Sequence, residues 1–423
     1  MNYYYKIRKE AILLEYVIKN INIVTLTGDE ILYNYDVMIS EHKIVDIKKN
    51  ISSMREIDGT GKYLIPGLAD MHYHTEAKSE IENQNELKLL IANGVTTIRI
   101  MWGSEHALEL KSKQYQDDFM GPQVYVGSRI LDGNPPVFEG MRVVESIEDA
   151  RRAVKEAVES GYDFLKVYNN LLMPQYLEIL DSGKKYNLDI IGHVPVDVGC
   201  ENALNLGQYG FEHSKAIPKH LLFKAAKMAA YFDPTLITMK AVSLIKNDQI
   251  QDEMYHEGVA KYVDANTIKE WKENVAFFKT YDFKFDRTYQ EYVADIKKFH
   301  DAGGFLLTGT DTPMPFCVPG FALHEELQIF SEAGIDNGSI LRAATINAAK
   351  SNHWVDEVGS IEGGKIANLV ILNSNPIENI KNTMDIDAVI LRGKYINRDA
   401  LDLMLGDVKT YCQSTKDILK NTI

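Results

Sequence analysis

Residues 64–74 read LIPGLADMHYH, an apolar segment that ends in two histidines one residue apart. We interpret this segment as a strand, in which side chains alternate between the two faces, so that His72 and His74 point the same way. Two imidazoles on one face can bind a single cation such as zinc, iron or nickel. A lone H-x-H pair is also common as an accident of surface or core packing. Its meaning therefore depends on the segments that follow.

Seven more apolar segments follow this one and alternate with amphipathic helical patterns. They occupy residues 94–101, 123–131, 163–169, 189–194, 210–214, 231–237 and 304–311. A representative helix is predicted at 146–161, where Ser146 with Asp149 resembles a capping box and Gly161 stands at the expected C-cap. Eight strands that alternate with helices predict an α/β fold, a (β/α)8 barrel of the TIM type. The alternative topology is a doubly wound sheet, but no G-x-G-x-x-G sequence follows any of these segments.

The sequence on either side of these strands has a different character. Residues 17–65 contain short β-branched segments separated by polar turns, and residues 355–400 contain further segments of this kind. We expect both ends of the chain to build one small β-sandwich domain, with the barrel spanning residues 66–354. Residues 238–303, between the seventh and eighth strands, are predicted to form a helical insertion. An insertion of this size suits a lid or a contact in a homo-oligomer.

The composition is that of a globular enzyme with an acidic surface. The 423 residues carry a formal net charge of −14, and 45% of them are hydrophobic. An acidic surface repels phosphate backbones, so we expect a small-molecule substrate and no nucleic-acid partner. No stretch approaches the roughly 18 apolar residues of a membrane span. Three widely spaced cysteines, and an N-terminus without an apolar signal segment, lead us to expect a cytoplasmic protein.

A lysine lies inside the fourth predicted strand. Alternation places Lys166 on one face with Phe164 and Tyr168, and places Leu165 and Val167 on the other. Two interpretations are open, because a lysine is costly to bury. Lys166 could extend its ammonium group to solvent at the strand end. Alternatively, it could be a neutral amine that takes up CO2 and becomes a carboxylate-like bridge between two cations.

Three further metal-competent side chains fall at the ends of predicted strands. His193 ends the fifth strand, His213 the sixth and Asp311 the eighth. Each has an ordinary alternative, since either histidine could pack in the core and Asp311 could cap the segment after it. A carboxylate here can also bind a cation and accept a proton from an attacking water. A barrel builds its active site where its strands end, so we expect all six side chains to share one site.

The order of these motifs resembles that of the amidohydrolase superfamily, specifically its imidazolonepropionase-related and prolidase-like branch. The resemblance spans nearly the whole chain. It is carried by LIPGLADMHYH, DFLKVYN, IIGHVPVDVG, GFEHS, LLTGTDT, LHEELQIFSEAGIDNGSILRAATINAA and GSIEGGKIANLVIL. It implies that His72, His74 and Asp311 bind one divalent cation, and that Asp311 is the catalytic general base.

The resemblance also implies a second, more exposed cation on His193 and His213, with an N6-carboxylated Lys166 bridging both. We expect two zinc ions, with a single ion as the alternative. The implied reaction is metal-dependent cleavage of an amide-like C–N bond in a dipeptide-like, N-acyl amino acid or cyclic amide substrate.

Two other functions fit the same superfamily. Mononuclear deaminases share the H-x-H pair, a later histidine and the aspartate. They carry a glutamate three residues after the fifth-strand histidine, however, where this chain has Val196. The second alternative is a non-catalytic scaffold protein on the same fold. For substrate binding, the positions near strand ends and helix starts lead us to predict contacts from Tyr168, Tyr231 and His324.

Overall fold

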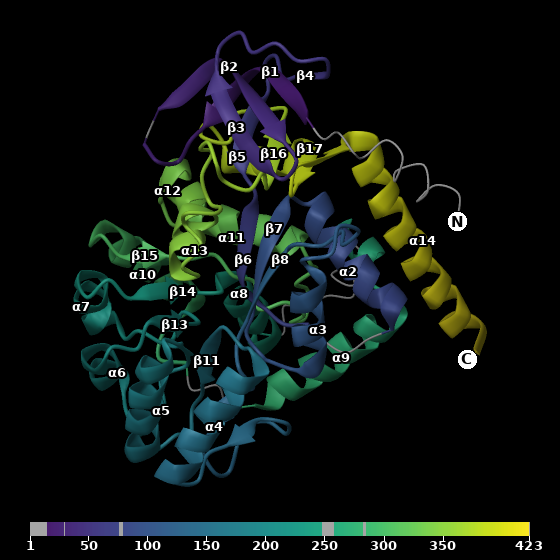
Figure 1. Cartoon of the computed structure of the whole chain (residues 1–423). Coiled ribbons are helices and arrows are strands. Elements are labelled where there is room, and N and C mark those ends of the chain that lie inside the picture. The colour runs from purple at the N-terminus through teal and green to yellow at the C-terminus, as the bar shows by residue number, and fades with distance from the viewer. Residues whose placement is uncertain (1–14, 29, 76–78, 248–257, 282–284, 423) are drawn as a thin grey trace.

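A computed structural model describes residues 15–28, 30–75, 79–247, 258–281 and 285–422. Strands from the two ends of the chain lie together at the top of Figure 1, in purple and yellow-green, and helices surround the parallel strands below them. The α/β class predicted from the sequence is confirmed. Among the described residues, no helix combines the length and apolar character that crossing a bilayer requires.

The upper sheet draws strands from both ends of the sequence. These are β1 (Glu15–Val24), β2 (Ile31–Ser40), β3 (Lys43–Lys48), β4 (Glu56–Asp58), β5 (Tyr63–Pro66), β16 (Leu369–Leu372), β17 (Ile386–Leu391) and β18 (Lys394–Asn397). Their order is β18-β17-β16-β5-β1-β2-β3, with β4 paired to β1. The antiparallel pairing of β5 with β16 joins the two ends of the chain. A separate apolar cluster, which includes Ile18, Val37 and Ile390, forms the core of this sheet.

The parallel strands form two sheets that are joined by two isolated bridges. The first contains β6 (Leu68–Tyr73), β7 (Val95–Ile100) and β8 (Gln123–Val126). The second contains β9 (Leu131–Asp132), β10 (Arg142–Val143), β11 (Phe164–Val167), β12 (Asp189–Gly192), β13 (Gly210–Glu212), β14 (Tyr231–Asp233) and β15 (Phe305–Leu306). Parallel bridges join Gly127 to Phe164 and Tyr73 to Thr312.

Helices follow most of these strands. They are α2 (Glu80–Ala92), α3 (Glu105–Lys113), α4 (Ile147–Ser160), α5 (Met173–Tyr186), α6 (Cys200–Leu206), α7 (Leu222–Lys227), α8 (Leu236–Lys246), α9 (Ala265–Thr280), α10 (Tyr289–Asp301), α11 (Phe321–Glu332), α12 (Asn337–Ala343), α13 (Ile346–Ser351) and α14 (Arg398–Thr422). Ser146 caps α4 and Gly161 ends it in the left-handed region, both as predicted. The reciprocal bond of a capping box is not made, because the Asp149 carboxylate accepts from Arg142 at 2.8 Å instead.

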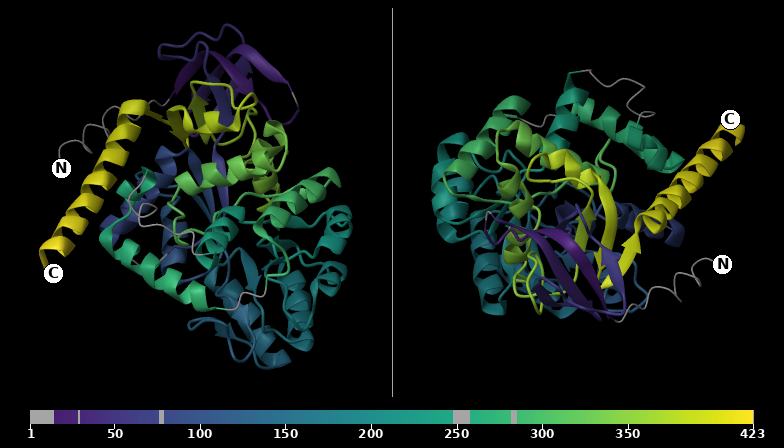
Figure 2. Two further views of the ribbon diagram at one scale, coloured as in Figure 1. Left: turned by 180° about the vertical axis from the view of Figure 1, so that it is seen from behind. Right: turned by 90° about the horizontal axis from the view of Figure 1, so that it is seen from above.

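Between β14 and β15, the described residues contain α8, the 3-10 turn η3 (Gly258–Tyr262), α9 and α10. Helix α10 packs against α7, α8, α11 and β15, whereas α9 contacts α8 and α14. Helix α14 runs along the outside of the molecule beside α2 and α9, as Figure 2 shows from behind. The segment predicted as one insertion therefore divides into a helix within the helical layer, α10, and a helix outside it, α9.

The two faces of β11 explain how a charged residue reaches the interior. Phe164 packs with Met101, Tyr125 and Ile191 in a small apolar cluster between the strands. Leu165 and Val167 belong instead to the large cluster beneath the helices. The alternation predicted for this strand is confirmed, and it places Lys166 on the same inner face as Phe164.

Candidate metal centre

Four histidines from three strands gather at the carboxyl ends of the parallel strands. His72 lies in β6 and His74 follows it, while His193 follows β12 and His213 follows β13. The ring centroids of His72 are 5.2 Å from His74 and 4.6 Å from His213, and those of His193 and His213 are 4.7 Å apart. Side chains distant in sequence therefore form one cluster, which we call the histidine cluster.

Asp311 lies between the histidines of this cluster. Its Oδ1 is 3.0 Å from Nε2 of His74 and 3.4 Å from Nε2 of His72, and its Oδ2 is 3.9 Å from Nδ1 of His213. Burial alone would raise the pKa of Asp311, but His213, His74 and Lys166 together hold it below its usual value. Both Asp311 and His213 have positive φ, at 56° and 69°. Backbone of this kind is retained mainly where the surrounding structure demands it, as at functional sites.

Lys166 is buried in β11, with 1% of its surface exposed. Its Nζ has no hydrogen-bond partner among the described residues. Burial lowers the pKa of Lys166 to about 8, although Glu212 and Asp311 act in the opposite direction. Its charge acts on His72, His193 and His213, so the amine lies close to the histidine cluster. The interpretation in which the ammonium reaches solvent is wrong, because the side chain is enclosed.

Three of the four rings are fixed through the same nitrogen. Nδ1 of His72 lies 2.6 Å from Glu212, Nδ1 of His193 lies 2.8 Å from Asn169 Oδ1, and Nδ1 of His213 lies 2.8 Å from Thr235 Oγ1. The Nε2 atom of each of these three rings is therefore available to bind a metal ion. Burial lowers the pKa of these three rings well below the usual value, so they are neutral.

These residues fit a divalent cation. A metal requires neutral imidazoles and ionised carboxylates, and ligating histidines usually donate through their other nitrogen. His72, His74 and Asp311 lie close enough together to share one ion. The unpaired amine of Lys166 beside them is an uncompensated buried polar group that such a ligand set would explain.

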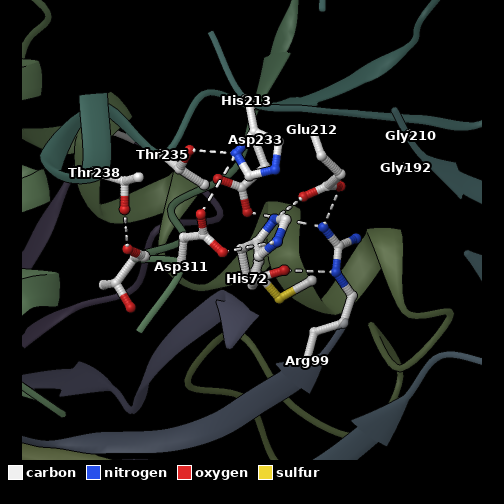
Figure 3. A network of polar contacts seen from close by, with 12 residues as sticks. His72, Arg99, Gly192, Gly210, Glu212, His213, Asp233, Thr235, Thr238 and Asp311 are labelled. Carbon is white, nitrogen blue, oxygen red and sulfur yellow. Dashed lines mark hydrogen bonds and ion pairs between the residues drawn. The ribbon is translucent and has the colours of Figure 1, made fainter. Parts of the chain in front are cut away.

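A buried network of charges beside His72 was not predicted (Figure 3). The guanidinium of Arg99, in β7, donates to Glu212 Oε1 at 2.7 Å and lies 3.8 Å from Asp233 Oδ2. Burial, followed by the charge of Glu212, raises the pKa of Asp233 well above its usual value. His72, Glu212 and Asp233 are also spaced closely enough for a cation, but Arg99 already contacts the two carboxyl groups. The available signal was a charged residue inside each of three apolar strands.

The structure separates the three predicted substrate-binding residues. Tyr168 stacks on His193 with ring centroids 3.9 Å apart, so it lies at the histidine cluster. Tyr231 begins β14 at the opposite end of the strands, where it packs against Tyr209 and Phe305. The prediction that Tyr231 lines the site is corrected, because the cluster forms where the strands end rather than where they begin.

His324 is also away from the cluster. It lies in α11, and its Nε2 is 3.0 Å from the carbonyl oxygen of Asn93 while its Nδ1 is 2.9 Å from Thr383 Oγ1. Both ring nitrogens therefore join helices α2 and α11 to the turn η4 (Ile380–Met384). Its predicted substrate contact is replaced by a packing role.

Two curated relatives align with most of this chain. The chain is 25% identical over 394 residues to an imidazolonepropionase from Caldanaerobacter subterraneus, covering 82% of this chain and 85% of that protein. It is 23% identical to a 5-methylthioadenosine/S-adenosylhomocysteine deaminase from Thermoanaerobacter pseudethanolicus, covering 96% and 99%.

Solved structures share the fold. A Xaa-Pro dipeptidase with bound methionine superposes with a TM-score of 0.71 at 20% identity, covering 90% of this chain and all of that one. The bottromycin amidohydrolase superposes with a TM-score of 0.78 at 20% identity, covering 94% and 90%. The profile of the amidohydrolase family matches residues 63–396. The chain belongs to the amidohydrolase family, whose members are hydrolases that act on small molecules and typically bind a divalent metal ion.

Proposed function

We propose that this protein cleaves an amide-like C–N bond of a small molecule with water, using divalent cations. The proposed ligands are His72, His74, Lys166, His193, His213 and Asp311. The observation that carries this proposal is the buried amine of Lys166 beside the histidine cluster, for which the described part of the chain offers no hydrogen-bond partner. Addition of CO2 to the neutral amine forms an N–C bond and releases one proton. The product would be an anionic group whose two oxygens could each serve as a ligand for a divalent cation.

We also propose that the two parallel sheets close into an eight-stranded (β/α)8 barrel, with residues 17–65 and 355–400 as the small domain. Two bridges support closure, one between Gly127 and Phe164 and one between Tyr73 and Thr312. Backbone hydrogen bonds of 2.8 Å accompany both, from Ser128 to Phe164 and from His74 to Thr312. Closure would bring β6 and β15 together, which is what places Asp311 against His72 and His74.

The residues around the site divide the chemical work. A divalent cation held here would lower the pKa of a bound water and polarise the substrate carbonyl. Asp311 then accepts a proton from the attacking water and passes it to the leaving nitrogen. Its position suits this role, because Oδ1 faces His74 and His72 while Oδ2 faces His213. Tyr168, stacked on His193, provides an aromatic wall for the substrate.

Lys215 favours a substrate with a carboxylate. It follows His213 by two residues, and it lies within electrostatic range of both His193 and Asp311. The residue is exposed, although the groups packed around its amine lower its pKa by burial. A cation at this place can pair with the free carboxylate of a dipeptide or an N-acyl amino acid. The Xaa-Pro dipeptidase that shares the fold acts, by its name, on dipeptides, which belong to the same class of substrate.

Deamination is the second candidate, because the deaminase from Thermoanaerobacter pseudethanolicus aligns with 96% of this chain. Two features of the chain favour amide hydrolysis over it. The buried Lys166 suits a site with two ions, and the position three residues after His193 carries Val196, which has no acid group and is 82% exposed.

A substrate panel tests the proposal. The protein, loaded with zinc or cobalt in the presence of bicarbonate, is assayed with Xaa-Pro dipeptides, N-acetyl and N-formyl amino acids, and adenosine derivatives. We expect release of a free amino acid from members of the first three groups. Ammonia release from the adenosine derivatives alone would establish the deaminase alternative, and silence across the fully loaded panel would reject both.

A further inference from the structure

The ring of His72 is held by a chain of buried groups that the proposed chemistry does not use (Figure 3). Glu212 bridges two partners, with Oε2 at 2.6 Å from Nδ1 of His72 and Oε1 at 2.7 Å from Nη2 of Arg99. Arg99 is fixed in turn by a 2.6 Å hydrogen bond from its Nε to the carbonyl oxygen of Met71. Arg99 is fully buried, and His72 and Glu212 are each 1% exposed.

This arrangement decides which nitrogen of His72 carries the proton. A carboxylate has no hydrogen to donate, so Nδ1 must be the donor and Nε2 keeps its lone pair. Nε2 is the atom that faces Asp311, at 3.4 Å. The partners of the other rings do not impose this choice, because the amide of Asn169 and the hydroxyl of Thr235 can each donate or accept.

Arg99 fixes the orientation of the Glu212 carboxylate and thereby the tautomer of His72. It donates to one carboxylate oxygen and leaves the other for His72, so both oxygens of Glu212 are occupied in one orientation. The buried guanidinium also supplies the positive charge that a buried carboxylate needs. The same two residues would also form an ion pair that joins β7 to β13 and stabilises the fold. A test of the inference must therefore distinguish positioning of His72 from stabilisation of the fold.

We propose that Glu212 and Arg99 are a positioning pair that holds His72 in the tautomer able to bind metal, and that this pair thereby sets the affinity of the site for its inner cation. The inference rests on the metal site of the proposed function. It adds two residues that contact neither substrate nor metal and act through His72 alone.

Glu212→Gln is the informative variant. The new amide would turn its oxygen toward Arg99, which can only donate, and its NH2 group toward Nδ1 of His72. Nδ1 must then accept, so the proton moves to Nε2 and occupies the position that the metal needs. We expect the affinity for Co²⁺, measured by competition with a chromophoric chelator, to fall by about 10–100-fold.

Glu326→Gln is the matched control. Glu326 is also a fully buried carboxyl group, but it accepts from the backbone amides of Leu236 and Ile237 at 2.8 and 2.6 Å and contacts none of the proposed ligands. Its replacement should destabilise the protein while leaving Co²⁺ affinity within about 2-fold of wild type. Equal losses of affinity in both variants would show a purely structural role and overturn the inference.

Long-range ¹H–¹⁵N spectra of the metal-free protein, labelled at histidine, read the tautomer directly. The His72 signal is assigned by its loss in His72→Gln. We expect a protonated Nδ1 in wild type and a protonated Nε2 in Glu212→Gln. A wild-type ring protonated at Nε2 would overturn the inference without any variant of the pair. Wild-type protein that binds no Co²⁺ refutes the proposed function, whereas unchanged affinity in a folded Glu212→Gln refutes this inference alone.

Discussion

The two ends of the parallel strands differ in chemistry although the same strands form both. At the carboxyl ends lie His193, His213 and Asp311, with their partners. At the amino ends, the rings of Tyr231 and its neighbours Tyr209 and Phe305 pack 5.1 and 5.5 Å apart. The comparison suggests that the two ends have different roles. Packing at the apolar end stabilises the fold, whereas the buried polar side chains at the other end serve the proposed reaction. Changes at the two ends should therefore have different effects.

The largest effect is expected from Lys166→Ala, at the polar end. The variant removes the group proposed to link the two halves of the site, so bound metal and activity should both be lost. Short carboxylic acids should restore part of each by entering the space left by the side chain. Metal analysis and turnover measured on the same sample check this. Full activity in the variant would contradict the bridging role.

Asp311→Asn should be the next most severe change. The amide keeps the shape of the side chain but cannot accept the proton, so turnover should fall by roughly 10²–10⁴-fold while much of the metal is retained. Steady-state kinetics at saturating metal check the prediction. Turnover within a few-fold of wild type would remove Asp311 from the proton-transfer step.

Lys215→Met, also at the polar end, tests substrate binding separately from the chemical step. If Lys215 pairs with the substrate carboxylate, KM should rise by about 10-fold with kcat nearly unchanged, because one charge-assisted contact is lost. Lys219→Met is the control, since Lys219 is an exposed lysine four residues further along. The effect should vanish for substrates whose carboxylate is amidated, and equal effects on both substrate classes would argue against the pairing.

Tyr231→Ala tests the apolar end. The ring is partly buried, so its loss should lower the free energy of unfolding by about 1–3 kcal/mol. Because the ring is remote from the histidine cluster, kcat/KM should stay within about 2-fold of wild type. Chemical denaturation and kinetics measured together check both statements. A large loss of activity in a folded variant would return Tyr231 to the active site.

The prediction that lies furthest from activity concerns acid stability. Burial lowers the pKa of His324 to about 4, whereas an exposed histidine titrates near 6.5. Between these values the unfolded chain binds the proton and the folded chain does not, so acidification favours unfolding. This stabilisation is complete above about pH 6.5 and decreases toward pH 4, by on the order of 2–4 kcal/mol. His324→Gln should flatten the decrease, and an unchanged pH profile in unfolding experiments would contradict it.

The sequence predicted the positions of the six proposed ligands but not their surroundings. These six candidates could be singled out because five of them stand at or just after the end of an apolar strand, where parallel strands converge, and Lys166 is a charged residue inside one. Arg99 and Glu212 could not be assigned, because their roles arise from contacts between β7, β13 and β6 that no local pattern encodes. The charged residues Arg99, Glu212 and Asp233 in three mainly uncharged strands were the available hint.

The two misplaced residues show different limits. For Tyr231, the predicted start of the strand was right, and the error was to expect its first residue at the carboxyl ends of the strands: the tyrosine opens β14, whereas Asp233 ends it. For His324, helical periodicity left the orientation of the ring undetermined, and the structure turns it toward Asn93 and Thr383. Sequence patterns indicated which end of the strands holds the histidine cluster, but the register of each element decides which side chains reach it.

Anomalous diffraction at the zinc edge, from crystals grown with zinc and bicarbonate, tests the central claim most directly. The account predicts peaks about 2.0–2.2 Å from Nε2 of His72 and His74 and from Asp311, with density for a carboxyl group continuous with Nζ of Lys166. Peaks confined to the protein surface, with an unmodified Lys166 and no ion among the four histidines, would contradict it.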